Sequence, residues 1–531
     1  MKKNIFKIIA IIVPVLMFAS CTDLNITPEN TSSSGIVFST FDGTKGALAK
    51  VYGAYSTTGN QGPAGKPDLP IVGIDEGSNA DFLRGWFNHQ ELPTEEAFCV
   101  WNDPGIPDLN NTNFTTSNMF TAGLYYRLII QIMYANEFIR NANESLGAEV
   151  PNFKAEARFI RAFDYWVLMD LFGNPPFVTE KDATGILPAQ ISRADLFNYV
   201  ESELKDIADN GLLKAPKTNE YGRADQAAAW ALLARIYLNA EVYTGTAHWA
   251  DAITYSKKVI DAGYSLKGNY EQLFFADNNL NNPEVILPIT YDGTRTRLYG
   301  GTTFLINCAF FDKYLATFQN IVIGNGIFDN ANWNGYRPRK EFSENLFTSG
   351  DKRRLLVGNY PELGPKPGMA PDKDNINGLM VYKWRNIQSA STPSNVLNGT
   401  DRAYADIDFP LFRLAEQYLI YAEAVTRGGG GSRTDALNYI NQLRNRAGLT
   451  NINDSQLTAN FVLDERSREL YWECFRRTDL IRYGLFTSNN SLWEWKGGVQ
   501  AGRGVDAHFN LYPIPSMDVN ANKNLTQNPG Y

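Results

Sequence analysis

The chain has 531 residues, a formal net charge of -8 at pH 7 and 44% apolar residues. An acidic chain without a Lys/Arg-rich stretch argues against nucleic acid as a partner, because phosphate binding needs clustered positive charge. Beyond the N-terminus no apolar run is long enough to cross a bilayer, which argues against a membrane-spanning body.

The N-terminus is typical of a secretory signal peptide. Three lysines among the first seven residues precede an apolar stretch, Ile8 to Ala19, that is too short to span a bilayer. The small pair Ala19-Ser20 stands directly before Cys21, as at the end of bacterial lipoprotein signals. We predict a signal peptide over residues 1–20, lipidation of Cys21 and a lipidated flexible tether over 21–40. The alternative is an ordinary cleaved signal followed by a chance cysteine.

Removal of this signal takes twenty residues and three lysines from the chain, which leaves 511 residues and a net charge of -11. The remaining cysteines, Cys99, Cys308 and Cys474, are odd in number and irregularly spaced. They do not form a disulfide framework, although one bridge is compatible with the sequence. A chain of this length can build one large domain or two coupled domains.

Apolar residues recur at helical spacing along most of the chain. The predicted helices are Ala47–Tyr55, Ala122–Asn143, Ala155–Phe172, an amphipathic run that begins at Ser192, Ala227–Ala240, His248–Gly263, 411–428, 433–448 and Val462–Tyr483. Gly173 and Pro175-Pro176 give the third helix a clear end. Ser192 is expected to cap the fourth helix.

Small residues and aromatic rings recur at matching places in these helices. Two pairs share the pattern: Ala234, Tyr237, Ala252 and Ala422, Tyr418, Ala436. The pattern is typical of tetratricopeptide-like helix pairs, although a clean 34-residue period is missing. The sequence therefore predicts a mainly α-helical fold.

Three long segments, 59–119, 268–400 and 487–531, lack a convincing helical pattern. They are too long and too aromatic to be linkers. Long loops inside a compact protein are usually functional. We therefore look for a site in these irregular segments.

Six segments in order resemble the SusD/RagB family. They are EARFIRAFDYWVLMDLFGNPPFV, YGRADQAAAWALLARIYLNAEVY, LFRLAEQYLIYAEA, ALNYINQLRNRAGL, DERSRELYWECFRRTDLIRYG and LYPIPSMDVNANKNLTQNPGY. The resemblance covers Cys21 to Tyr531. Members of this family are surface lipoproteins that capture nutrients, mostly glycans, in Bacteroides and its relatives. Where the family usually has glycine and histidine, this chain has Cys474 and Phe475, a departure that concerns local packing.

The resemblance implies a right-handed scaffold of about four tetratricopeptide-like helix pairs with a loop-rich layer packed on it. It also implies a partner, a SusC-like TonB-dependent outer-membrane barrel over which the lipoprotein closes as a lid. We predict an N-terminal half and a C-terminal half. Their bounds are 41–267, with a ligand-loop insertion at 59–119, and 268–531, with an irregular part at 268–400, helix pairs at 410–486 and a tail at 487–531.

Catalytic motifs are missing from the sequence. His89, His248 and His508 are far apart in sequence, which gives thin support for a metal pair or a nucleophile triad. No GxSxG, HExxH, P-loop or paired CxxC motif is present. The remaining enzymatic alternative is a helical glycoside hydrolase, which needs two carboxylates about 5–10 Å apart. We predict no catalytic residue, no metal and no cofactor.

Aromatic and polar residues in the irregular segments suit a shallow glycan site. Sugar rings stack their C–H faces on aromatic rings, while amide, carboxylate and guanidinium groups bond to the hydroxyls. The family resemblance implies that ligand contacts come from loops in two of these segments, 59–119 and 268–400. The candidates are Trp86, Trp101, Trp333, Tyr299, Tyr291, Tyr336, Arg84, Asn102, Asp81 and Asp75. The alternative for each aromatic residue is packing within the loop layer.

We predict non-catalytic binding of an oligosaccharide or polysaccharide at the cell surface. The ligand would pass to the barrel partner, and the lipid at Cys21 would hold the protein on the outer membrane. A peptide cargo in the same lid role is the first alternative. A purely structural surface protein is another.

The segment Glu156–Val178 threads charges through apolar and aromatic residues, as a catalytic helix would. Arg158, Arg161 and Asp164 are spaced so that they can form ion pairs along one side of a helix. A similar series of charges recurs in 465–479. We interpret both series as ion pairs that join helices, because buried charges need partners.

Overall fold

A computed structural model describes residues 34–310, except 64, 70, 76 and 78, and residues 326–531, except 328, 330, 359–377 and 393. The predicted signal peptide and the lipidation site Cys21 lie outside the described residues. None of the described helices is both long and apolar enough to cross a membrane. The described cysteines, Cys99, Cys308 and Cys474, are buried and free.

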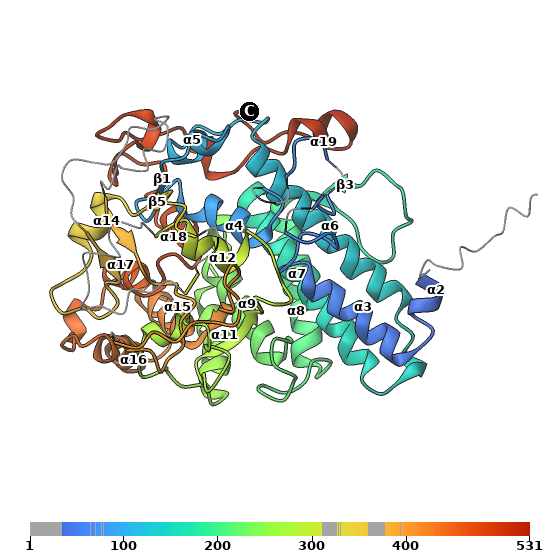
Figure 1. The fold of residues 1–531 in the computed structure, drawn as a ribbon, viewed down its shortest axis with the longest axis horizontal. Coiled ribbons are helices and arrows are strands. Elements are labelled where there is room, and N and C mark those ends of the chain that lie inside the picture. Colours follow the sequence, from blue (N-terminus) through green and yellow to red (C-terminus); the bar gives the residue numbers. More distant parts are fainter. Residues whose placement is uncertain are drawn as a thin grey trace, which may run out of the picture.

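The described chain is mainly helical, as predicted (Figure 1). Eight helices form a scaffold in which each packs on the next. They are α3 (Phe41–Gly53), α6 (Met119–Asn141), α7 (Val150–Phe172), α8 (Arg193–Asp209), α9 (Gln226–Leu238), α11 (Trp249–Asp261), α15 (Leu414–Thr426) and α16 (Arg433–Arg446). The tetratricopeptide-like pairing, its handedness and the domain boundaries stay predictions.

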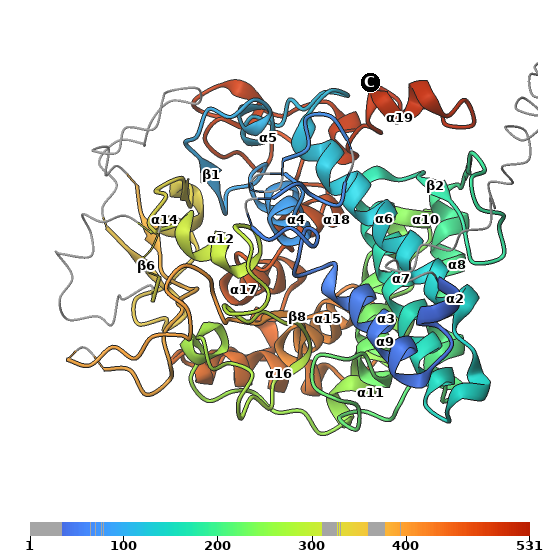
Figure 2. The ribbon, with the colours of Figure 1, turned by 45° about the vertical axis from the view of Figure 1, so that its right-hand side comes forward.

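Shorter elements make up the rest of the described chain, and most of them belong to a loop-rich layer that lies beside the scaffold in Figure 2. The helices are α2 (Ser34–Val37), α4 (Phe82–Glu91), α5 (Ile106–Asn110), α10 (Ala240–Thr244), α12 (Gly301–Asn307), α14 (Lys340–Asn345), α17 (Ala459–Leu470), α18 (Arg476–Arg482) and α19 (Ser516–Ala521). The antiparallel strand pairs are β1 (Phe98–Cys99) with β5 (Tyr336–Arg337), β2 (Pro176–Phe177) with β3 (Ala189–Gln190), β4 (Val285–Ile289) with β8 (Phe409–Arg413), and β6 (Leu356–Val357) with β7 (Met380–Val381).

Local signals explain where the scaffold helices begin and end. The Ser192 side chain accepts a hydrogen bond from the backbone N–H of Asp195 at 3.1 Å, so the predicted cap of α8 is confirmed. Helix α7 ends at Gly173, whose φ of 74° lies in the left-handed region that glycine tolerates. The predicted end of this helix is therefore also confirmed.

The charges of Glu156–Val178 join helices, as interpreted from the sequence. Arg161 donates to Asn136 of α6 at 2.7 Å and pairs with Glu203 of α8 at 2.9 Å. Asp164 accepts a hydrogen bond from Tyr55 at 2.8 Å. These partners lie on separate segments, so the charges of α7 hold the scaffold together.

The prediction that 59–119, 268–400 and 487–531 lack a convincing helix is wrong, because all three segments contain helices. Helix α4 occupies Phe82–Glu91, and the Asp81 side chain caps it by accepting from Arg84 N–H at 2.7 Å. All ten residues of α4 are buried. Phe82, Leu83, Trp86 and Phe87 do follow helical spacing, but the pattern is too short for periodicity alone to identify a helix.

The predicted single helix Val462–Tyr483 is also wrong, because it divides into α17 and α18. Trp472 and Cys474 between them have left-handed φ values of 60° and 69°. Carboxylates from the α4 region bond to this break: Cys474 N–H donates to Glu91 at 2.7 Å, and Trp472 N–H donates to Glu96 at 3.3 Å. Tertiary partners thus replace the intrahelical hydrogen bonds.

Candidate functional site

Three predicted aromatic residues, Trp101, Tyr299 and Trp333, lie together and are only half-buried. Tyr404, which is itself buried, packs against Tyr299, and we call these four residues the aromatic arc. The centroid distances are 6.4 Å for Trp101–Trp333, 6.3 Å for Tyr299–Trp333 and 5.5 Å for Tyr299–Tyr404. The successive ring planes are inclined by 48°, 61° and 47°, so the four rings do not share one flat face.

The pairing of β1 with β5 brings Trp101 and Trp333 together. Val100 N–H donates to Gly335 O at 2.9 Å, and Trp101 Nε1 donates to Trp333 O at 3.3 Å. A Cβ atom at Gly335 would lie 2.2 Å from the Trp101 ring. Glycine is therefore required at 335 for Trp101 to lie against the backbone of the other strand.

Asp81 positions Tyr299 rather than facing the ligand side. Its carboxylate is buried, caps α4 and also accepts from Gly301 N–H at 3.0 Å, at the start of α12. Burial raises the pKa of Asp81 above its usual value, while its two backbone hydrogen bonds oppose that rise. The carboxylate thus links α4 to the turn that carries Tyr299.

Arg84 supports the arc from below. Its guanidinium carbon lies 5.8 Å from the Trp101 ring centroid and 4.8 Å from that of Phe304. Its Nη1 donates to Gly77 O at 2.5 Å, and Gly77 N–H donates to Asp75 Oδ1 at 2.8 Å. Arg84 is buried and Asp75 is exposed, so Asp75 is the better placed of the two to meet a ligand.

Asn102 follows Trp101 directly in the chain and is exposed. Its amide can donate to and accept from hydroxyl groups. Asn102 and Asp75 are therefore the two predicted polar candidates that the structure leaves open to solvent.

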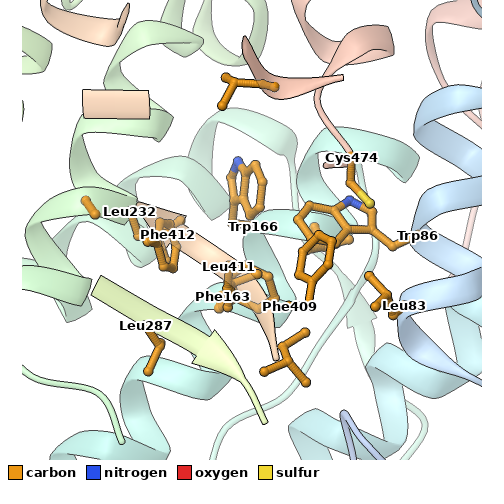
Figure 3. Close-up of a cluster of buried hydrophobic side chains, with 14 of the residues drawn as sticks. Leu83, Trp86, Phe163, Trp166, Leu232, Leu287, Phe409, Leu411, Phe412 and Cys474 are labelled. Atoms are coloured by element: carbon orange, nitrogen blue, oxygen red, sulfur yellow. The ribbon is translucent and has the colours of Figure 1, made fainter. Parts of the chain in front are cut away.

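The structure places the candidates Trp86, Tyr291 and Tyr336 in the interior. Trp86 is 1% exposed and packs edge-on against Phe163 and Trp166 at centroid distances of 5.9 and 6.1 Å (Figure 3). A buried ring cannot stack on a ligand. Trp86 therefore packs within the interior and does not contact a ligand.

Tyr291 and Tyr336 have supporting positions. Tyr336 is fully buried, lies 5.3 Å from the Trp101 ring centroid and donates its hydroxyl to Asn88 at 2.8 Å. Tyr291 is held through its backbone: its N–H donates to the Asp408 carboxylate at 2.8 Å, and its ring lies against Gly301. Both rings hold the loops beneath the arc.

Tyr404 was not among the predicted site residues. It follows the segment 268–400 directly, in the polar run Asp401–Asp408 that precedes β8. Its ring faces Tyr299 and also lies 5.9 Å from the guanidinium carbon of Arg297. An aromatic residue in a polar run beside an irregular segment is a signal that could have identified it.

Groups suited to catalysis are not assembled at the arc. His89 is buried with ring nitrogens near Gly85 O and the Thr121 hydroxyl, and the other two histidines contact acids elsewhere. The described residues include no grouping of His, Cys, Asp and Glu that could hold a metal ion. The arc can stack on a ligand and hydrogen-bond to it.

Comparison with known proteins identifies the family. Residues 325–531 match the model of the SusD family, and residues 88–238 match a model described as starch-binding associating with outer membrane. The starch-binding protein SusD of Bacteroides thetaiotaomicron is 36% identical over 566 aligned residues, which cover 100% of this chain and 99% of that protein. SusD-like protein P25 of Formosa agariphila is 25% identical, over 76% of this chain and 78% of that protein.

Solved structures share the fold. Surface glycan-binding protein A from Bacteroides fluxus superposes with a TM-score of 0.68 at 20% identity, over 93% of this chain and 100% of that one. The Bacteroides thetaiotaomicron surface glycan-binding protein A in complex with laminarihexaose has a TM-score of 0.66 at 19% identity, over 92% and 99%. These relatives are named for binding. Its full-length similarity to SusD and the two family models together establish that the chain belongs to the SusD family.

Proposed function

We propose that the aromatic arc binds a starch-type oligosaccharide. The observation that carries this proposal is the contact of the half-exposed rings of Trp101, Trp333 and Tyr299, which come from distant parts of the sequence. Aromatic faces stack on the C–H faces of sugars. The relative that is 36% identical over the whole chain is named a starch-binding protein.

The shape of the arc favours a curved ligand. Neighbouring ring planes are inclined by 48° and 61°, so a glycan has to change direction to stack on more than one ring. An α-linked glucan coils and can follow the turn from Trp101 to Tyr299. Asn102 and Asp75, both exposed, would bond to sugar hydroxyls at the edge of the stack.

Binding without turnover would serve import. In this proposal the lipid at Cys21 anchors the protein to the outer membrane, and a SusC-like TonB-dependent barrel receives the glycan. A single lipid chain gives only marginal membrane binding, so the barrel would supply the rest. Tethering raises the effective glycan concentration at the pore, so modest affinity suffices. Cys21→Ala should move the protein out of the membrane fraction; retention there would contradict lipid anchoring.

Ligand preference tests the proposal. Calorimetry should show binding of maltoheptaose, weaker binding of the β-linked laminarihexaose and cellohexaose, and no binding of a peptide mixture, with no shortening of any glycan on prolonged incubation. Preference for laminarihexaose would shift the ligand class to β-glucans. Binding of peptides alone, or glycan cleavage, would overturn the proposal.

A further inference from the structure

A second cavity, of about 530 Å³, shares no residue with the aromatic arc. Its lining comes from the loop at 268–271, the turn at 351–355, Tyr382 and Arg446 at the end of α16. A volume of this size falls within the roughly 300–1,000 Å³ that is usual for small-molecule sites. The proposal that follows does not depend on the ligand of the arc.

The acidic side chains of this cavity already have cationic partners. The two acids of the lining are Asp351 and Glu271. Asp351 pairs with Arg353 at 2.9 Å, and Glu271 pairs with Arg385. Both arginines are buried, so these pairs extend from the wall of the cavity into the interior. A guanidinium thus balances each of the two carboxylates.

Two basic side chains of the lining, Lys352 and Arg354, have no carboxylate partner in the part of the chain that the structure describes. Both are exposed. The Arg354 guanidinium makes one long hydrogen bond, from Nη1 to Leu356 O at 3.4 Å. The third basic residue, Arg446, is already engaged with Glu284 at 2.6 Å. The cavity therefore has an unbalanced positive charge at Lys352 and Arg354.

A buried hydroxyl group also meets the cavity. Tyr382 lines the cavity and is 8% exposed, yet its hydroxyl forms no hydrogen bond with the described residues. The oxygen is not among the side-chain atoms that are closed to water, so it faces the open space. Burial raises the pKa of Tyr382 and the Glu271 charge adds to the rise, while the charges of Arg385 and Arg354 oppose it. Because buried polar groups are nearly always hydrogen-bonded, this hydroxyl indicates a ligand.

We propose that this cavity binds a carboxylated sugar of one or two rings. A carboxylate accepts charge-assisted hydrogen bonds from ammonium and guanidinium groups, which Lys352 and Arg354 supply from one turn. The Tyr382 hydroxyl can donate to and accept from the hydroxyls of the ring. Asn269, which is exposed in the lining, offers an amide for the same purpose.

Digalacturonate is the probe, with α-1,4-linked galactobiose as the neutral sugar and acetate as the anion without a ring. Calorimetry on the purified protein at pH 7 and low ionic strength should show digalacturonate binding and at least tenfold weaker binding of galactobiose and of acetate. Absence of digalacturonate binding would overturn the proposal. Equal affinity for galactobiose would overturn the role of the charge, and equal affinity for acetate would overturn the role of the sugar.

Competition separates this site from the arc. Saturation of the protein with maltoheptaose should leave the affinity for digalacturonate unchanged. Loss of digalacturonate binding under saturation would place the acidic sugar at the arc and overturn the proposal. Failure of maltoheptaose to bind would overturn the proposed function of the arc alone, because digalacturonate binding is measured without it.

Variants locate the site. Lys352→Gln combined with Arg354→Gln should weaken digalacturonate binding at least tenfold. The control, Lys523→Gln combined with Arg503→Gln, removes the same charge from exposed residues outside the cavity and should change the affinity less than twofold. Tyr382→Phe keeps the ring and should weaken binding at least threefold. Unaltered affinity in both the Lys352/Arg354 variant and Tyr382→Phe, or an equal loss in the control, would contradict the assigned site.

Discussion

At the scale of residues, a neighbouring glycine and a helix cap determine which aromatic rings remain exposed to a ligand. Trp101 lies over Gly335 and next to Trp333, so its ring is held at the surface by backbone that has no side chain in the way. Arg84 and Tyr336 fill the space beneath it. The ring is thus fixed before a ligand arrives, which reduces the ordering cost of binding.

Gly335→Ala tests this arrangement. The added Cβ would lie 2.2 Å from the Trp101 ring, so the ring must move, and maltoheptaose affinity should fall about tenfold, or ~1.4 kcal/mol. The control is Gly46→Ala in α3, where an added Cβ meets nothing within 4 Å. Calorimetry on both variants should separate them; equal affinity would show that the position of Trp101 does not matter.

Cys474 tests backbone strain at the break between α17 and α18. Its φ of 69° suits glycine, the residue usual in the family at this position, better than any residue with a Cβ. Cys474→Gly and Cys474→Ala both remove the buried thiol, yet the glycine variant should be more stable by about 1 kcal/mol in urea unfolding. Greater stability of the alanine variant would show that the left-handed backbone carries no strain.

Part of the site could be predicted from residue type alone. Trp101, Trp333 and Tyr299 are aromatic residues in irregular, polar segments, where exposure is common. Trp86 and Tyr336 meet the same description but are buried, because tertiary packing of α4 and β5 decides their exposure. Sequence spacing carries no information about that packing.

At the scale of elements, the junction of α4 with α17 and α18 is held by acids. Glu91 and Glu96 accept backbone N–H groups at the helix break, and Glu96 also accepts from the Ser467 hydroxyl at 2.5 Å. This junction explains why the predicted long helix divides: a helical pattern in the sequence cannot show that carboxylates from another segment compete for its backbone. The scaffold helices, in contrast, were predictable because apolar residues recur at helical spacing over a longer stretch of sequence in each of them.

At this junction, Glu96 should make the free energy of unfolding depend on pH. Burial and the charge of Glu95, opposed by Arg476, raise the pKa of Glu96 from about 4.5 to about 7. The folded state therefore binds this proton more tightly, and the stability that Glu96 contributes is complete below pH 4.5 and lost as the pH rises to 7. Glu96→Gln replaces the carboxyl group by an amide that does not titrate, so the variant should not lose this stability as the pH rises.

Urea unfolding at pH 5 and pH 8 measures the effect. Relative to the unsubstituted protein, Glu96→Gln should gain on the order of 2 kcal/mol of unfolding free energy between the two pH values. Any hydrogen bond lost on substitution lowers the unfolding free energy equally at pH 5 and pH 8, so it cancels in the difference between the two. A difference that stays constant from pH 5 to pH 8 would contradict a raised pKa at Glu96.

Arg161 tests the role of the charges in α7. Its guanidinium is 3% exposed and joins α7 to α6 and α8, so Arg161→Ala should cost about 3 kcal/mol of unfolding free energy. Maltoheptaose affinity should stay within twofold, because the arc is elsewhere. The exposed pair of Lys257 with Asp261 gives the control, Lys257→Ala, which should cost less than about 1 kcal/mol. Lost affinity with unchanged stability would make α7 a binding element.

At the scale of the whole molecule, the helical scaffold carries a loop-rich layer in which distant segments meet. Figure 1 shows β1, β5, α4 and α12 grouped together, and Figure 2 shows β1, α4 and α12 in the same part of the molecule. The helical class and the family followed from periodicity and motif order. The assembly of the arc did not, because the β1–β5 pairing joins short segments more than two hundred residues apart that have no signal in sequence.

The most direct test of the account is maltoheptaose binding by the double variant Trp101→Ala/Trp333→Ala, measured by calorimetry. Its control is Trp230→Ala, which removes a half-buried tryptophan of α9 outside the arc. The account predicts at least a hundredfold loss of affinity in the double variant, about 2.7 kcal/mol, and affinity within twofold in the control. Binding by the double variant as tight as that of the unsubstituted protein would contradict the aromatic arc as the glycan site.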